Sequence, residues 1–126
     1  MEMNNETGVA KGILAPKGFE AAYTSAGIKK NNALDMALIY SETPCIAAGT
    51  FTRNRVFAAP VQWDRGLIQT SPCFNAIVVN AGVANACTGE KGLQDCKDTA
   101  EAVAKNISCN PENVLICSTG VIGANL

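Results

Sequence analysis

Three apolar runs along the chain have the length of β-strands. Residues 34–41 (LDMALIYS) lie between Asn-Asn and Glu-Thr-Pro, while residues 74–80 (FNAIVVN) and 114–120 (VLICSTG) are apolar stretches that end in small polar residues. A continuous apolar run of this length is typical of a strand buried on both faces of a sheet. We therefore predict three buried strands, with residues 74–80 in a central position.

Two further stretches resemble strands less strongly. Residues 45–52 (CIAAGTFT) contain small and β-branched side chains one turn after the first run, which predicts an antiparallel hairpin with residues 34–41. Gly49 within it would mark a bulge or a close backbone approach. Another strand is expected to start at Val56 and to stop near Pro60, because proline cannot donate to a central ladder.

Helical periodicity is clearest in the second half of the chain. Residues 61–69 predict a short helix, and a longer one follows from apolar residues at three- and four-residue steps with Lys, Asp and Glu between them: Leu93, Cys96, Ala100, Val103 and Ile107. One face of the long helix is expected to be buried. Its acidic residues Asp95, Asp98 and Glu101 are expected on the solvent face.

The order of these elements predicts an α/β fold. Early hairpins followed by a strand, a helix and a strand favour a layered sandwich in which sheets are covered by helices. With 126 residues and 48% hydrophobic content, the chain is long enough for one modest core. Residues 1–17 show weak periodicity and are expected to be a mobile N-terminal segment, which leaves residues 18–126 as the folded α/β part.

Charge and composition exclude several classes of function. Ten Lys and Arg against eleven Asp and Glu give a net charge of −1, and aromatic residues make up 6%, which disfavours nucleic-acid binding. No apolar stretch reaches the length of a membrane span. The chain contains no His, which removes Ser-His-Asp and Cys-His catalysis and most zinc sites unless a partner supplies the imidazole.

The six cysteines indicate a reducing compartment. The start of the chain has no apolar core of a secretory signal, and no Cys pair has the C-x-x-C spacing of a redox or metal site. We therefore expect free thiols, a cytoplasmic location, no metal and no cofactor. Cys87 and Cys117 lie in apolar runs, so all six thiols are interpreted as small buried hydrophobes.

Two loops made of small polar residues leave predicted buried strands. The first is residues 80–89 (NAGVANACTG), where Asn80 and Asn85 offer amide donors and acceptors and Gly82 permits close backbone approach. These three residues are candidates for a substrate pocket. The alternative is structural, since a strand must turn before a helix, and spacing alone favours this alternative.

The second loop is residues 118–123 (STGVIG). A strand that delivers Ser-Thr-Gly into a turn can aim a hydroxyl and backbone N–H groups at one point, as an oxyanion hole requires. In the structural alternative, Ser118 and Thr119 bond their own backbone and Gly120 merely fits the turn. Such triplets are common, so the residues alone favour that alternative here as well.

Three segments taken together resemble a known family. Residues 18–61, then AIVVNAGVANACTGEKGLQD at 76–95, then VLICSTGVIG at 114–123 resemble, in type, order and spacing, the N-terminal part of the α chain of ornithine acetyltransferase. That family is the bifunctional glutamate N-acetyltransferase of arginine biosynthesis. The first loop departs from the family pattern Asn-Ser-Gly-Asn-Ala-Asn at Ala81 and Val83.

The resemblance implies a Thr-nucleophile enzyme, made as a precursor that cuts itself into two chains that stay together. Acetyl passes from N-acetylornithine, or from acetyl-CoA in bifunctional members, to glutamate. The resemblance assigns the oxyanion hole to Thr119 and Gly120. It also implies that the nucleophilic Thr lies on a β chain of the same precursor, in an α2β2 assembly, so that this chain alone is inactive.

Two other readings stay open. One is a related Thr-nucleophile hydrolase of similar fold, such as an aminopeptidase. The other is a non-catalytic binding domain, which is compatible with a nucleophile that lies outside this chain.

Overall fold

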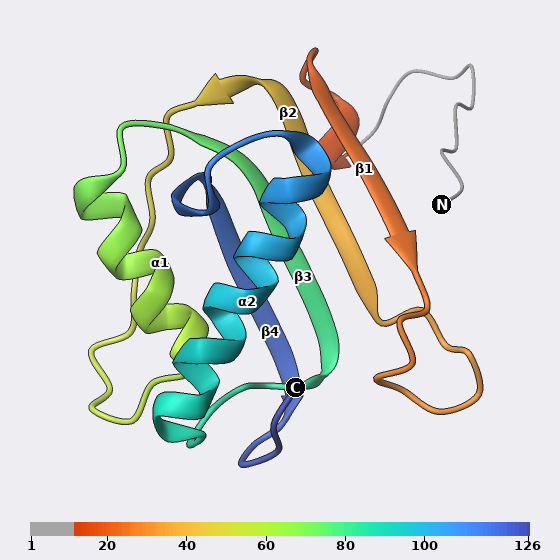
Figure 1. Cartoon of the computed structure of the whole chain (residues 1–126), viewed down its shortest axis with the longest axis vertical. Helices are drawn as coiled ribbons and strands as arrows, with labels where there is room; N and C mark the ends of the chain where they lie inside the picture. The colour runs from red at the N-terminus through yellow and green to blue at the C-terminus, as the bar shows by residue number, and fades with distance from the viewer. Residues whose placement is uncertain (1–11) are drawn as a thin grey trace.

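The computed structural model describes residues 12–126, and its centre is one four-stranded sheet (Figure 1). The strands are β1 (Phe19–Thr24), β2 (Met36–Cys45), β3 (Phe74–Val83) and β4 (Val114–Val121), the helices are α1 (Ala59–Thr70) and α2 (Gly89–Ile107), and two short 3-10 turns, η1 and η2, span Gly12–Leu14 and Pro111–Asn113. The predicted α/β class is confirmed. The predicted mobile segment lies outside the described residues up to residue 11, and the remainder of it contains η1.

The strands follow one another across the sheet in chain order. β1 pairs antiparallel with β2, β2 pairs antiparallel with β3, and β3 pairs parallel with β4. A parallel pair needs a long crossover, and α2 supplies it between β3 and β4. As a result, β3 and β4 end at the same edge of the sheet, the lower edge in Figure 1.

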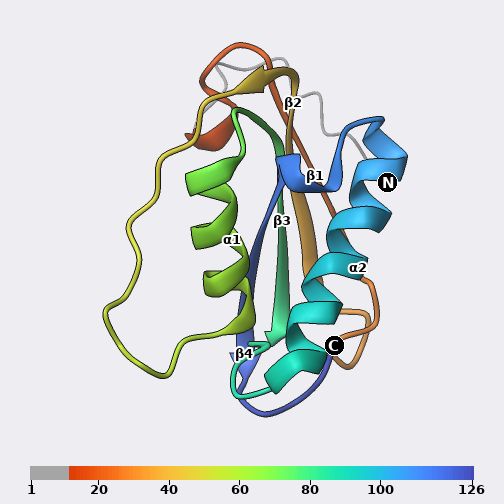
Figure 2. The ribbon, with the colours of Figure 1, turned by 60° about the vertical axis from the view of Figure 1, so that its left-hand side comes forward.

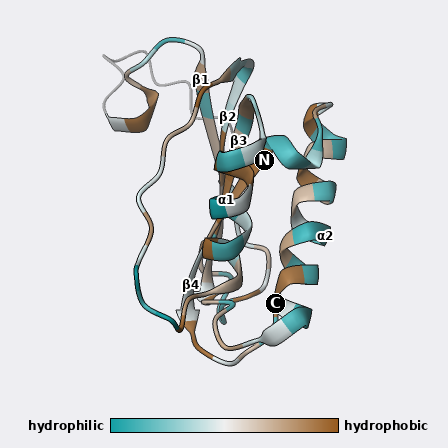
Figure 3. Cartoon of the chain, turned by 90° about the vertical axis from the view of Figure 1, so that its left-hand side faces the viewer, coloured by the Kyte–Doolittle hydropathy of each residue, from teal (hydrophilic) through white to brown (hydrophobic). Residues whose placement is uncertain are grey.

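α2 packs on one face of the sheet, which we call the helix face. Ala76, Val78, Val114 and Ile116 of the two parallel strands form a buried cluster there with Cys96, Ala100 and Ala104 of α2. Leu93, Val103 and Ile107 pack around it, so the predicted apolar stripe is confirmed. Figure 3 shows the polar side of α2 turned away from the sheet.

α1 lies along the outer edge of β4 rather than over a face. The Trp63 indole N–H donates to the Val114 carbonyl (3.1 Å), and the Asp64 Oδ1 accepts the Ile116 N–H (2.9 Å). An edge strand presents unpaired backbone groups, and these two side chains satisfy them. Figure 2 shows α1 and α2 on either side of β4.

The opposite face of the sheet carries two cross-strand rows, which we call the open face. One row is Ala21–Ile39–Ile77–Leu115 and the other is Tyr23–Ala37–Val79–Cys117. Leu67 of α1 packs on Leu115, but within residues 12–126 no helix crosses the rest of these rows. β3 therefore alternates between buried and half-buried positions, and the prediction that it is buried on both faces is wrong for the described part of the chain.

Two predicted strands are wrong. Residues 46–58 form no strand, and β2 pairs with β1 and β3 instead of with residues 45–52. Pro60 is not a strand terminator but sits in the first turn of α1, where its missing N–H costs nothing. Gly49 does make a close approach, since a Cβ there would lie 2.9 Å from Ile68 Cδ1.

Two predictions about single side chains also need correction. The six cysteines are unpaired, yet Cys96 is the one that is fully buried; Cys87 and Cys117 are exposed, because the first lies in a loop and the second on the open face. Asp95 is 6% exposed rather than on the solvent face of α2. No helix in the described part of the chain is long and apolar enough to cross a membrane.

Candidate active site

The two loops singled out by sequence meet at the carboxyl ends of β3 and β4. In the parallel ladder Asn80 pairs with Ser118, Ala81 with Thr119, and Gly82 with Gly120, and the register shifts at Val83. Segments separated by almost 40 positions in the chain are thus neighbours, because the strands are parallel and adjacent. Carboxyl ends of adjacent parallel strands are a common position for ligands in α/β folds.

Gly82 and Gly120 touch through their backbones. A Cβ on Gly120 would overlap the carbonyl group of Gly82, and both residues have positive φ, +121° and +136°. A side chain at Gly120 would therefore need a rare backbone conformation and would also collide with the neighbouring strand. Contrary to the prediction of a turn, Ser118, Thr119 and Gly120 lie within β4, and the turn begins after Val121. The two strand ends can approach this closely because positions 82 and 120 are both glycine.

Ser118 is held by its neighbour on β3. Its hydroxyl donates to Asn80 Oδ1 (2.5 Å), and the Asn80 amide donates in turn to the Val83 carbonyl (2.8 Å). Asn80 is 5% exposed. Its side chain therefore ties the end of β3 to the end of β4.

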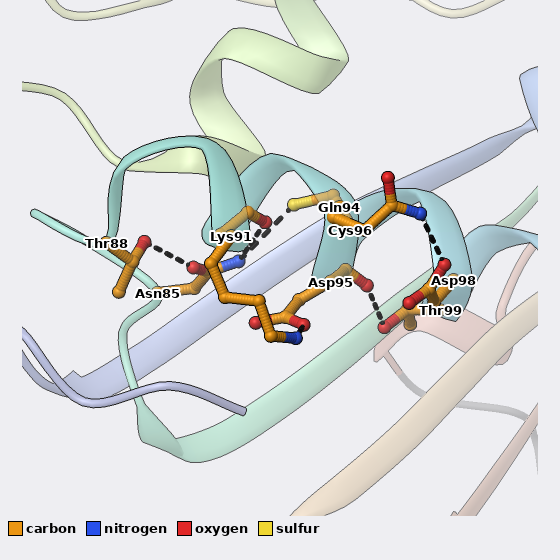
Figure 4. A network of polar contacts seen from close by, with 9 residues as sticks. Asn85, Thr88, Lys91, Gln94, Asp95, Cys96, Asp98 and Thr99 are labelled. Atoms are coloured by element: carbon orange, nitrogen blue, oxygen red, sulfur yellow. Dashed lines mark hydrogen bonds and ion pairs between the residues drawn. The ribbon is translucent and has the colours of Figure 1, made fainter.

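Asn85 joins the loop after β3 to the start of α2 (Figure 4). Its amide donates to the Gly92 carbonyl (2.9 Å) and to Cys96 Sγ (3.4 Å), and its Oδ1 accepts the Thr88 hydroxyl (2.7 Å). The residue is 2% exposed. The side-chain amides of Asn80 and Asn85 both form hydrogen bonds within this chain. Of the three residues predicted for the pocket, Gly82 is the one whose backbone lies where the two strand ends touch.

Burial at this junction leaves little interior space. A cavity of about 10 Å³ lies between α2 and the strand ends, lined among others by Asn80, Asp95 and Ser118. This is about the space of one water molecule. Asp95 pairs with Lys91 through Oδ1, while its buried Oδ2 has no partner among the described residues. The interior between α2 and the strand ends thus has room for about one water molecule and not for a substrate.

Thr119 is oriented differently from Ser118. It is exposed, and its hydroxyl makes no hydrogen bond to any residue between 12 and 126. By strand alternation it shares the open face with Cys117 and lies next to Ala81. A hollow of about 180 Å³ on that face is lined by Val79 and Ala81, among others. The structure thus brings Thr119, Gly120 and Gly82 together at an exposed position.

Two acidic residues near the site escaped sequence reasoning. Desolvation raises the pKa of Asp64 to about 6, although the hydrogen bond that Asp64 accepts from the Ile116 N–H acts to lower it. Ile116 lies two residues before Ser118, which brings Asp64 close to the site. Asp35 lies beside Ala81, because the Ala81 N–H donates to the backbone carbonyl of Asp35. Their signal in the sequence was weak: each is a single carboxylate whose partners lie on another element or across a loop. No group of three or more His, Cys, Asp or Glu suited to a metal occurs within residues 12–126.

The chain is similar in sequence to known proteins of arginine biosynthesis. The chain is 47% identical to the arginine biosynthesis bifunctional protein ArgJ of Mycobacterium leprae over 134 aligned positions, which cover all of this chain and 33% of that protein. It is 52% identical to ArgJ 1 of Clostridium acetobutylicum over 108 positions, covering 86% of this chain and 26% of that one. The chain therefore spans between about a quarter and a third of the length of these relatives.

Solved structures give the same result. The ornithine acetyltransferase of Mycobacterium tuberculosis, complexed with ornithine, superposes with a TM-score of 0.87 at 48% identity over 91% of this chain and 62% of that chain. The ArgJ protein of Bacillus halodurans superposes with a TM-score of 0.82 at 36% identity, over 87% and 57% of the two chains. The model of the ArgJ family matches residues 20–126, and the chain belongs to that family.

Proposed function

We propose that this chain is the N-terminal portion of an acetyltransferase of arginine biosynthesis, which moves acetyl from N-acetylornithine to glutamate and can also use acetyl-CoA as donor. One observation carries the proposal: in a member of the ArgJ family, an exposed Thr119 and a Gly120 at positive φ lie at the end of a parallel strand pair. The relative from M. tuberculosis was solved with ornithine, a product of that transfer.

In this proposal Thr119 and Gly120 stabilise the oxyanion of acetyl transfer. A nucleophilic Thr hydroxyl on a partner chain attacks the acetyl carbonyl, and the carbonyl oxygen becomes negative as the new C–O bond forms. When the C–N bond breaks, the amine of ornithine takes a proton and leaves, and the acetyl group stays on the Thr oxygen as an ester. Glutamate's amine then attacks this ester and loses a proton, while the C–O bond breaks and the Thr hydroxyl is restored. Fixed donors aimed at the developing charge lower the barrier of both steps.

The partner is the C-terminal β chain of the same precursor, in a cytoplasmic α2β2 assembly that we call the assembled enzyme. A Thr freed by self-cleavage can use its own α-amino group as the base. This agrees with the absence of His from the sequence. Asn80, Gly82 and Asn85 would support the pocket by fixing the ends of β3 and β4 and the start of α2.

An activity assay of the assembled enzyme tests this proposal. Full-length precursor is expressed, its two chains are verified by intact mass, and acetyl transfer from N-acetylornithine to glutamate is followed beside peptide hydrolysis. We expect acetyl transfer by the assembled enzyme and none by the verified 126-residue chain. Peptide hydrolysis without transfer would favour the aminopeptidase-like alternative, and neither activity would favour a binding domain.

A further inference from the structure

The loop between β1 and β2 is wrapped around one buried carboxylate. Asp35 is 3% exposed, its Oδ1 accepts the Ala26 N–H (2.6 Å), and its Oδ2 accepts the Lys29 N–H (2.7 Å). The hydrogen bond from Lys29, followed by that from Ala26, holds the pKa of Asp35 below its ordinary value. Both oxygens of a charged carboxylate thus fix the path of residues 26–29.

The backbone of Asp35 is tied to two strands. Its N–H donates to the Thr24 carbonyl at the end of β1 (3.2 Å), and its carbonyl accepts the Ala81 N–H of β3 (2.8 Å). Ala81 precedes Gly82 and pairs with Thr119. The residue that organises the loop is therefore also bonded to the strand end that carries the candidate site.

The ordered loop packs directly on Gly82. A Cβ at Gly82 would lie 2.8 Å from Ile28 Cγ2 and 3.3 Å from Lys29 Cγ, so the loop leaves room for a hydrogen atom there and no more. The other side of Gly82 touches Gly120. The loop therefore contacts Gly82, and Gly82 contacts Gly120.

We propose that Asp35 is a positioning residue for the end of β4 at Thr119 and Gly120. It holds Ala26–Lys29 against Gly82, and Gly82 in turn fixes the path of Gly120. The expected effect on kcat rests on the proposed function. The expected effect on the structure at Gly82 and Gly120 rests on the geometry alone. A role limited to closing the loop would leave the end of β4 at Gly120 undisturbed when the carboxylate is changed.

The kinetic test compares Asp35→Asn with Asp98→Asn in the assembled enzyme. Both remove one negative charge, but Asp98 is exposed on α2 and bonds Gln94 instead of a backbone loop. We expect Asp35→Asn to lower kcat by about 10- to 100-fold with KM little changed, since misplaced donors weaken the transition state more than ground-state binding. Asp98→Asn should match the unsubstituted enzyme.

A second pair of variants covers the case in which Asp35→Asn does not assemble. Ile28→Ala shortens the side chain that touches Gly82 and leaves the carboxylate in place, while Leu34→Ala shortens an exposed side chain of the same loop. We expect the first variant to lower kcat and the second to leave it unchanged. Equal kcat for Ile28→Ala and Leu34→Ala would overturn the inference.

Hydrogen–deuterium exchange of the same proteins gives a readout independent of activity. We expect Asp35→Asn to speed exchange in peptides covering residues 25–30 and also in those covering 79–84 and 117–123. Faster exchange confined to residues 25–30, or an unchanged kcat, would overturn the positioning role. An unsubstituted enzyme without acetyl transfer would refute the proposed function, while the exchange pattern would still decide the role of Asp35.

Discussion

Two glycines determine how the strand ends meet. Gly82 and Gly120 face each other across the β3–β4 ladder, both at positive φ, and neither has room for a side chain. Gly66 provides a contrast within the same chain, since it lies inside α1 and a Cβ there would meet nothing within 4 Å. Replacing glycine by alanine at Gly82 or Gly120 therefore tests an unfavourable φ together with a steric overlap. The same replacement at Gly66 tests helix propensity alone.

We expect Gly120→Ala to destabilise the assembled enzyme by roughly 2 kcal/mol or more, because an unfavourable φ and an overlap with the Gly82 carbonyl act together. Gly66→Ala should instead stabilise it by up to about 1 kcal/mol, because alanine favours the helix. Denaturant unfolding of both variants measures the difference. A Gly120→Ala variant as stable as the unsubstituted protein would show that the end of β4 can move away from β3.

Some of the residues at the site were predictable from the sequence and others were not. Thr119 and Gly120 belong to a short motif after an apolar run, so their place at a strand end was predictable. Asp35 and Asp64 were not, because each is a single acid in a mixed stretch and is defined by backbone groups across a loop or on another element. Asn80 and Asn85 were found, but no pattern in the sequence indicates that their amides are engaged internally.

At the scale of elements, α1 protects the exposed edge of β4. The side chains of Trp63 and Asp64 form hydrogen bonds with the Val114 carbonyl and the Ile116 N–H. These are the backbone groups with which a fifth strand would otherwise pair. Holding a carboxylate in this partly buried place is unfavourable, which is why the pKa of Asp64 rises to about 6. The same contact therefore stabilises the edge and makes it sensitive to pH.

The raised pKa predicts a pH-dependent stability. Between about pH 4 and 6 the folded protein holds a proton on Asp64 that the unfolded chain releases, so this residue makes stability fall as pH rises through that window. We expect Asp64→Asn, which keeps an acceptor for the Ile116 N–H, to remove this part of the slope. Thermal unfolding of the assembled enzyme from pH 4 to 7 measures it, with Asp98→Asn as the control. Parallel curves for the unsubstituted and Asp64→Asn proteins would contradict the account.

The elements themselves were predictable where the pattern is strong. α2, β3 and β4 follow from long periodic or continuous apolar runs, whereas β1 (FEAAYT) was missed because Glu20 interrupts a short stretch of small residues. Residues 46–58 look like strands from composition but pack as a loop beside α1, where Ala47 joins the cluster around Leu67. Which strands pair with one another depends on long-range contacts, and the local sequence pattern does not contain this information.

At the scale of the whole molecule, much of the open face has no cover within residues 12–126. Hollows of about 140 and 180 Å³ lie over it, and Ile39, Ile77 and Val79 are half-buried. Exposed apolar rows on a sheet favour association. The chain also spans about a third of its curated relatives, so further polypeptide is available in the family to cover this face.

We therefore expect the isolated chain to be unstable as a monomer. Size-exclusion chromatography with light scattering should give a mass well above the 13.1 kDa of one chain, or a species that unfolds without a cooperative transition. The assembled enzyme, with the open face covered, should give one defined mass and unfold in a cooperative transition. A monodisperse monomer of the chain with cooperative unfolding would show that the described residues close their own core.

The central claim is that this chain contributes half of an active site, the donors at Thr119 and Gly120. The most direct measurement is the kcat of Thr119→Ala in the mature, verified assembled enzyme, beside Thr119→Ser, which keeps the hydroxyl. The account predicts a loss of about 10²- to 10³-fold in kcat for Thr119→Ala, little change in KM or stability, and substantial activity for Thr119→Ser. Near-normal turnover by mature Thr119→Ala would contradict it and would leave the Ser-Thr-Gly stretch as a structural turn.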